Sequence, residues 1–160
     1  MSDAQLDTIQ QYLNSIPDFN ERMGQVVRQA IDYAIDECNT GRQDFSSLAK
    51  PEKAIVGVKV ESYARASFNW PVGDTLDFII GGIQFDCKMT IGSNWMIPTE
   101  AVNQICLLVQ ADVSANTFNV GLLRTTLDRL TSGTNQDKKR SVSAAGKTQI
   151  IWIAYNLNIP

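Results

Sequence analysis

Two aspartates and a lysine, Asp77, Asp86 and Lys88, have the types and spacing of a site that holds a divalent cation. Short apolar runs flank Gly81-Gly82, a pair typical of a two-residue β-hairpin turn. A turn at these glycines sets Asp77 across from Asp86 with Cβ atoms about 5 Å apart, where like charges repel. Lys88 points from the same face of the strand as Asp86. This convergence predicts a cation bound between the carboxylates.

The chemistry that this set supports is metal-assisted hydrolysis of a phosphate ester, as in metal-dependent nucleases. Asp77 and Asp86 can hold Mg²⁺, or Mn²⁺, together with the backbone carbonyl of Cys87. A bound ion lowers the pKa of its water and neutralises charge that develops on phosphorus. Lys88 can orient that water or stabilise the transition state as a point charge. The alternative is an exposed hairpin face with an ordinary Asp–Lys ion pair.

The composition removes several other classes of site. The 160-residue chain has no histidine, which excludes Ser-His-Asp and Cys-His catalytic pairs and histidine zinc sites. Hard oxygen ligands favour Mg²⁺ or Mn²⁺ over zinc. Three cysteines without C-x-x-C spacing indicate reduced thiols. Since no apolar run approaches the roughly 20 residues that span a bilayer, we expect a cytoplasmic protein without membrane contact.

The charge is uneven along the chain. Residues 1–119 carry a net charge of −7, and residues 120–160 carry a net charge of +4. A basic segment on an acidic protein can supply a local phosphate-binding surface. The residues that we expect to contact DNA are Arg124, Lys138, Lys139, Arg140, Lys147 and Asn94.

The elements that must position these residues alternate between helix and strand. Apolar residues at helical spacing predict an amphipathic helix over residues 20–37, and a second helix is expected over residues 51–69. In the hairpin that follows, Phe78 should face Phe85. The other expected elements are strands over 105–113, 118–123 and 149–157, a short helix over 124–130 and a basic loop over 132–148.

These elements indicate one mixed α/β domain over residues 1–160, with residues 1–15 loosely ordered. Gly146-Lys147-Thr148 is similar to the end of a nucleotide-binding P-loop, but Ser141 stands where the leading glycine belongs. A strand, and not a helix, is expected to follow. We therefore expect no nucleotide cofactor.

The arrangement of Asp77, eight further residues and Asp86-Cys87-Lys88 resembles the PD-(D/E)xK nuclease signature, and more narrowly the endonuclease domain of NaeI-type restriction enzymes. In that family a glutamate sixteen residues ahead of the first aspartate belongs to the site, and Glu61 stands there. The other segments that look like the family, in order, are Thr40-Gly41-Arg42, Leu48-Ala49-Lys50, Trp95-Met96-Ile97-Pro98 and Gly121-Leu122-Leu123-Arg124.

The resemblance implies the catalytic domain of a type II restriction endonuclease, with a central mixed β-sheet flanked by α-helices. It implies Mg²⁺-dependent hydrolysis of double-stranded DNA at a short palindromic sequence by a homodimer. Glu61, Asp77, Asp86 and Lys88 would be its catalytic residues. Family members also carry a C-terminal DNA-binding domain, which we expect to be absent from these residues.

Three alternatives stay open at this point. They are a mismatch-repair-like endonuclease that nicks DNA as a monomer, a non-cleaving module that binds DNA or associates with itself, and a Mg²⁺ phosphohydrolase that acts on nucleotides. The complete set of Glu61, Asp77, Asp86 and Lys88 favours a cleaving enzyme over a non-cleaving module.

Overall fold

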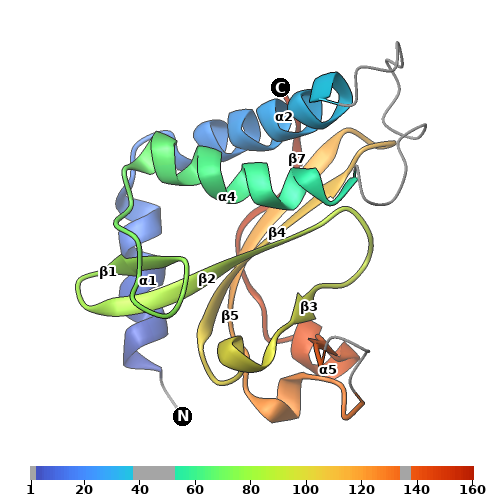
Figure 1. Cartoon of the computed structure of the whole chain (residues 1–160). Helices are drawn as coiled ribbons and strands as arrows, with labels where there is room; N and C mark the ends of the chain where they lie inside the picture. The colour runs from blue at the N-terminus through green and yellow to red at the C-terminus, as the bar shows by residue number, and fades with distance from the viewer. Residues whose placement is uncertain (1–2, 38–52, 134–137) are drawn as a thin grey trace.

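Five strands form the central sheet of the computed structural model, which describes residues 3–37, 53–133 and 138–160. The strands lie in the order β1-β2-β4-β5-β7, in which β2 and β4 are parallel and the other neighbours antiparallel. Their bounds are β1 Phe78–Ile80, β2 Ile83–Thr90, β4 Ile105–Asp112, β5 Thr117–Arg124 and β7 Ile151–Asn158. The mixed sheet with flanking helices confirms the α/β class (Figure 1).

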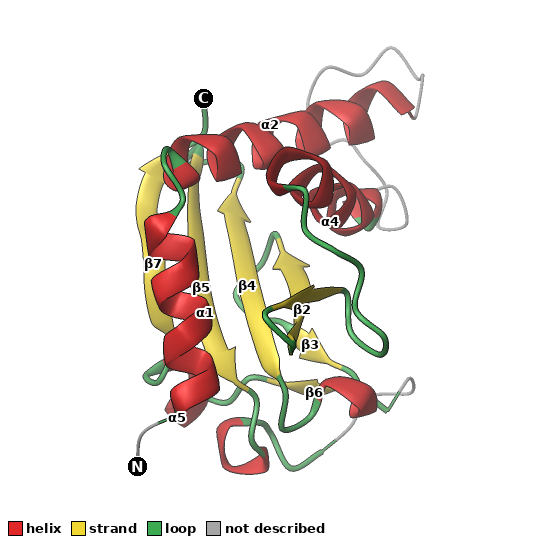
Figure 2. Ribbon diagram, turned by 90° about the vertical axis from the view of Figure 1, so that its left-hand side faces the viewer, coloured by secondary structure: helices red, strands yellow, loops and turns green. Residues whose placement is uncertain are grey.

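Helices α1 (Ala4–Ser15), α2 (Phe19–Glu37) and α4 (Ile55–Phe68) cover one face of this sheet (Figure 2). The expected helix over residues 20–37 is confirmed by α2, and the second expected helix by α4. Within the described part of the chain, no helix combines the length and the apolar character needed to cross a membrane.

For residues 3–15, helix α1 and its cap correct the expectation that residues 1–15 are loosely ordered, and residues 1–2 lie outside the described residues. Asp3 caps the helix, since its Oδ1 accepts the Leu6 N–H at 3.0 Å. Leu6, Ile9 and Leu13 are buried against the sheet. Their spacing places them on one side of the helix, so a single apolar stripe in a polar segment suffices to fix it.

The hairpin has the predicted turn and register. Gly81 and Gly82 have φ values of 58° and 80°, the left-handed backbone that such a turn requires. Phe78 pairs with Phe85, and both side chains are fully buried. The loop before the hairpin is fastened to it, because the Gln84 side-chain oxygen accepts the N–H groups of two loop residues.

Short elements cover the opposite face of the sheet. Strands β3 (Met96–Ile97) and β6 (Arg140–Ser141) pair with each other, and a second apolar cluster lies beneath them. The remaining short elements are η2 (Thr99–Ala101), η3 (Leu127–Arg129) and α5 (Ala144–Lys147). Thus the helix expected over 124–130 is only the 3₁₀ turn η3, and the expected loop over 132–148 contains β6 and α5.

Candidate active site

The structure brings Asp77 and Asp86 together at the base of the hairpin. The Asp77 N–H donates to Asp86 Oδ1 at 3.1 Å, and the Cys87 N–H donates to Asp77 Oδ2 at 2.8 Å. Each carboxylate therefore accepts a backbone N–H from the other arm of the hairpin, one position beyond the last paired residue of β1. These reciprocal bonds hold both side chains in place before any ligand binds.

Lys88 completes the cluster. Its Nζ lies 3.0 Å from Asp86 Oδ2. Asp86 and Lys88 are neighbours of Cys106 and Leu108 on parallel strand β4, and these two residues belong to the apolar cluster beneath β3 and β6. Asp86, at 5% exposure, is one of the few polar side chains buried in the described residues.

The electrostatics of the cluster show an excess of negative charge. Burial raises the pKa of Asp86, and the adjacent Asp77 carboxylate raises it further, despite the opposing effect of Lys88. Burial works against the charged form of Lys88, but the hydrogen bond to Asp86 and the nearby carboxylates outweigh it and raise the pKa of Lys88. The single positive charge of Lys88 thus balances only one of the two carboxylates, Asp77 and Asp86.

The two cysteines beside the cluster are chemically inert. Burial raises the pKa of the Cys87 thiol above its usual range and that of Cys106 to about 12. Both thiols stay protonated near neutral pH, whereas a nucleophile or metal ligand must be a thiolate. Only the backbone of Cys87 takes part in the site.

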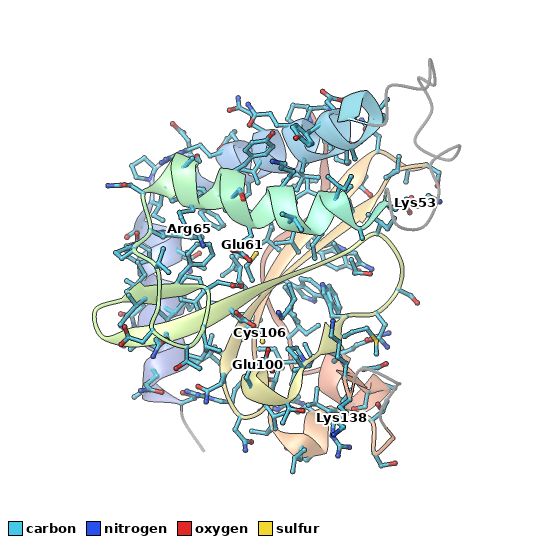
Figure 3. The ribbon with its side chains drawn as sticks, in the orientation of Figure 1. Lys53, Glu61, Arg65, Glu100, Cys106 and Lys138 are labelled. Atoms are coloured by element: carbon cyan, nitrogen blue, oxygen red, sulfur yellow. The ribbon has the colours of Figure 1, made fainter. Side chains whose placement is uncertain are left out.

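Glu61 approaches the hairpin from helix α4. Its Oε2 lies 3.0 Å from Nη2 of Arg65, one helical turn further on (Figure 3). Its charge is among the causes that raise the pKa of the Cys87 thiol, which places it near the strand. Within the described residues, however, no three Asp, Glu, Cys or His side chains gather closely enough to hold a metal ion. Glu61 is therefore not grouped with Asp77 and Asp86.

The donor set fits a hard divalent cation. Two adjacent carboxylates supply the oxygen ligands that Mg²⁺ prefers, usually with several waters kept by the ion. The pKa of Asp86 is raised first by burial and then by the adjacent Asp77, and a bound cation would offset both effects. Asp77, Asp86 and the Cys87 carbonyl are the groups that would hold it.

Comparison with known proteins shows the family of this chain. The sequence profile of the family described as restriction endonuclease NaeI matches residues 7–160. The chain belongs to the NaeI restriction endonuclease family. Type II restriction enzyme NaeI of Lentzea aerocolonigenes is 30% identical over 150 residues, which make up 93% of this chain and 47% of that enzyme. The chain thus spans about half the length of this relative.

In this NaeI family member, four of the five basic residues expected to contact DNA (Lys138, Lys139, Arg140 and Lys147) lie around β6 and α5. Lys138 is exposed, and with Arg140 it lines a hollow of about 540 Å³ that also includes Leu127. Arg140 Nη1 donates to the carbonyls of two preceding loop residues. Lys139 and Lys147 are half-buried. The role of these residues in binding DNA stays a prediction.

Arg124 and Asn94 are half-buried and hydrogen-bonded within the fold. Arg124 makes two hydrogen bonds to Asp3, from Nε at 2.8 Å and from Nη2 at 3.0 Å. The Asn94 amide donates to the Val142 carbonyl and accepts the Val142 N–H, which joins two loops. Their expected contact with DNA remains untested, and the structure shows another task for each.

Two residues beside the site were not singled out in the sequence. Arg65 could have been found from its i, i+4 spacing to Glu61, which places the two on one helix face. Gln84, which fastens the loop ahead of Asp77, has no comparable signal because its contacts depend on the folded loop.

Proposed function

We propose that this chain is the catalytic domain of a type II restriction endonuclease that hydrolyses double-stranded DNA at a short palindromic sequence, with Mg²⁺ or Mn²⁺ as cofactor. The observation that supports it is the cluster of Asp77, Asp86 and Lys88 in a member of the NaeI family. Activity on DNA in the cytoplasm is part of this proposal.

Each residue of the cluster has a task in the reaction. Asp77 and Asp86 would hold the cation, which when bound would supply a water of lowered pKa and offset charge on the phosphate. The backbone N–H groups that hold both carboxylates keep them in place for this task. Lys88 Nζ orients the attacking water or stabilises the negative charge that develops on the phosphate oxygens. The products are 5′-phosphate and 3′-hydroxyl ends.

The proposal includes a homodimer. A palindromic DNA site has two-fold symmetry, and two copies related by the same axis would present one cluster to each strand. The mass of the protein in solution, measured with and without DNA in Ca²⁺, tests this part separately.

Incubation with plasmid and phage DNA tests the activity. Discrete linear fragments in Mg²⁺ and intact DNA in EDTA are the expected results. Nicked circles alone would indicate the nicking endonuclease instead, and intact DNA in both conditions would indicate a non-cleaving module.

Substitutions in the cluster test the assignment of residues. Asp86→Asn and Lys88→Met should each lower the cleavage rate at least about a hundredfold, since each removes charge that acts in the transition state. Circular dichroism should show an intact fold for both. Asp74→Asn is the matched control, because Asp74 is an exposed aspartate in the loop that leads to Asp77. It should cleave at the wild-type rate.

A further inference from the structure

Arg65 connects the helix that carries Glu61 to the hairpin that carries the aspartate pair. Its Nη2 lies 3.0 Å from Glu61 Oε2, and its guanidinium carbon lies 5.2 Å from the centre of the Phe78 ring. Phe78 directly follows Asp77 in the chain and pairs with Phe85, the residue before Asp86. Figure 3 shows Arg65 and Glu61 together on the side of α4 that faces the hairpin. The Arg65 side chain thus contacts both Glu61 and the hairpin that carries the aspartate pair.

The guanidinium suits this position for two reasons. It can bond to a carboxylate with one edge while its flat face contacts an aromatic ring, which an ammonium group does less well. It also offsets the charge of Glu61, which would otherwise be repelled by the Asp77 and Asp86 carboxylates across the hairpin. Without Arg65, the Glu61 side chain would lose its ion-pair partner. We then expect it to rotate toward solvent.

We propose that Arg65 is a positioning residue of the DNA-cleaving site, which holds the Glu61 carboxylate against the hairpin through its contacts with Glu61 and Phe78. The inference rests on the proposed function and adds to it that Glu61, which the family resemblance implies as a catalytic residue, takes part in cleavage. Arg65 acts through Glu61 and does not itself touch the DNA.

Helix α2 contains a matched control for this pair. Arg28 Nη2 lies 3.0 Å from Asp32 Oδ1 at the same spacing of four residues, and the exposed fractions of the two arginine side chains are 33% and 34%. In both arginines Nε is buried without a hydrogen-bond partner among the described residues. The two arginines therefore differ mainly in what lies beside them, so a general effect of losing a helical ion pair should appear equally in both.

Single-turnover cleavage by the wild type, Arg65→Met, Arg65→Lys and Arg28→Met tests the proposal. Arg65→Met should cleave at least about tenfold more slowly, the scale of losses at residues that orient a metal site. The cleavage rate of Arg28→Met should stay within about twofold of the wild-type rate, although its Tm should fall by about as much as that of Arg65→Met. Arg65→Lys should recover part of the rate, because it keeps the charge but not the flat contact, and it serves as the test if the Met variant does not fold.

DNA affinity in EDTA separates positioning from direct DNA binding. We expect Arg65→Met to bind DNA within about twofold of the wild type. Equal rates for Arg65→Met and Arg28→Met would overturn the inference, and so would weaker DNA binding with an unchanged rate at saturating DNA. These outcomes require an active wild type and leave the proposed function standing, whereas a wild type without cleavage would overturn both.

Discussion

Two clusters of charged side chains in this molecule are built in opposite ways. Asp3 and Arg124 form a complementary pair, with hydrogen bonds of 2.8 and 3.0 Å between one carboxylate and one guanidinium. Asp77 and Asp86 place two carboxylates together with a single lysine. The guanidinium of Arg124 lowers the pKa of Asp3, whereas burial and Asp77 raise the pKa of Asp86. The first cluster favours the charged state of Asp3, whereas the second disfavours the charged state of Asp86.

The difference separates a cluster with a structural role from the cluster that we propose to be catalytic. Asp3 also caps α1, so its pair with Arg124 fastens the N-terminal helix to the end of β5. The aspartate pair fastens the hairpin only through backbone N–H groups and leaves a charge imbalance. Groups with perturbed pKa values concentrate at functional sites, which is consistent with the proposed role of Asp86.

Removing one carboxylate from the hairpin should have the largest effect on cleavage. Asp77→Asn should lower the single-turnover rate at least about a hundredfold, because it removes a ligand of the proposed cation. Arg124→Met, assayed well below its Tm, should cleave at the wild-type rate. Cleavage retained in Asp77→Asn would contradict the distinction between the two clusters.

Removing the guanidinium should have the largest effect on stability. Arg124→Met should lower the free energy of unfolding by about 1.5–3 kcal/mol, the scale of hydrogen bonds to charged groups, measured by urea denaturation. Arg28→Met, which breaks an ion pair within one helix, should cost about 0.5 kcal/mol or less. Unchanged DNA affinity in Arg124→Met would also show that Arg124 does not bind DNA.

Asp86→Asn should change stability less than Arg124→Met and in the opposite direction, since it should stabilise the metal-free protein in EDTA. Because the folded-state pKa of Asp86 is raised, the folded protein binds more protons than the unfolded chain, and stability falls as the pH rises through that pKa. The variant should therefore have a higher Tm than the wild type at pH 8. This difference in Tm, the gap between the two proteins, should become smaller as the pH is lowered. Mg²⁺ should reduce or reverse the gap by stabilising the wild type. A lower Tm for the variant at pH 8 without metal would contradict the charge imbalance.

The smallest effect is the loss, at acid pH, of the stability that the pair of Asp3 and Arg124 contributes. Since the folded-state pKa of Asp3 lies below its ordinary value of 3.8, its contribution is present above that value and is lost as the pH falls through the lowered pKa. Asp3→Asn should be less stable than the wild type at pH 7 and approach it near pH 2. Thermal unfolding across this range measures the difference, and a constant difference would refute the linkage.

Local patterns explain which parts of the fold were predictable. The hairpin register follows from two glycines and the alternation around them, and α2 from its apolar spacing. Helix α1 also has apolar residues at helical spacing, Leu6, Ile9 and Leu13, but the mostly polar composition of this segment led to a prediction of loose order. The parallel pairing of β2 with β4 is a contact between distant segments, for which the sequence carries no local signal.

The site divides in the same way. Asp77, Asp86 and Lys88 were predictable because one hairpin holds all three. Glu61 was assigned to the site only from the family resemblance. It lies on helix α4, and no local pattern shows that this helix packs near the hairpin. The pairing of Asp3 with Arg124 joins residues 121 positions apart, and only the folded chain shows it.

The alternation along β2 links catalytic competence to correct folding. Phe85 and Cys87 belong to the core beneath the helices, while Asp86 and Lys88 point to the other face. A slip of one residue in strand pairing would drive the carboxylate and the ammonium into that core and turn the apolar side chains out. A molecule misaligned in this way would lose its stability together with its site. The proposed cleavage activity would therefore report strand alignment, and its recovery would follow refolding.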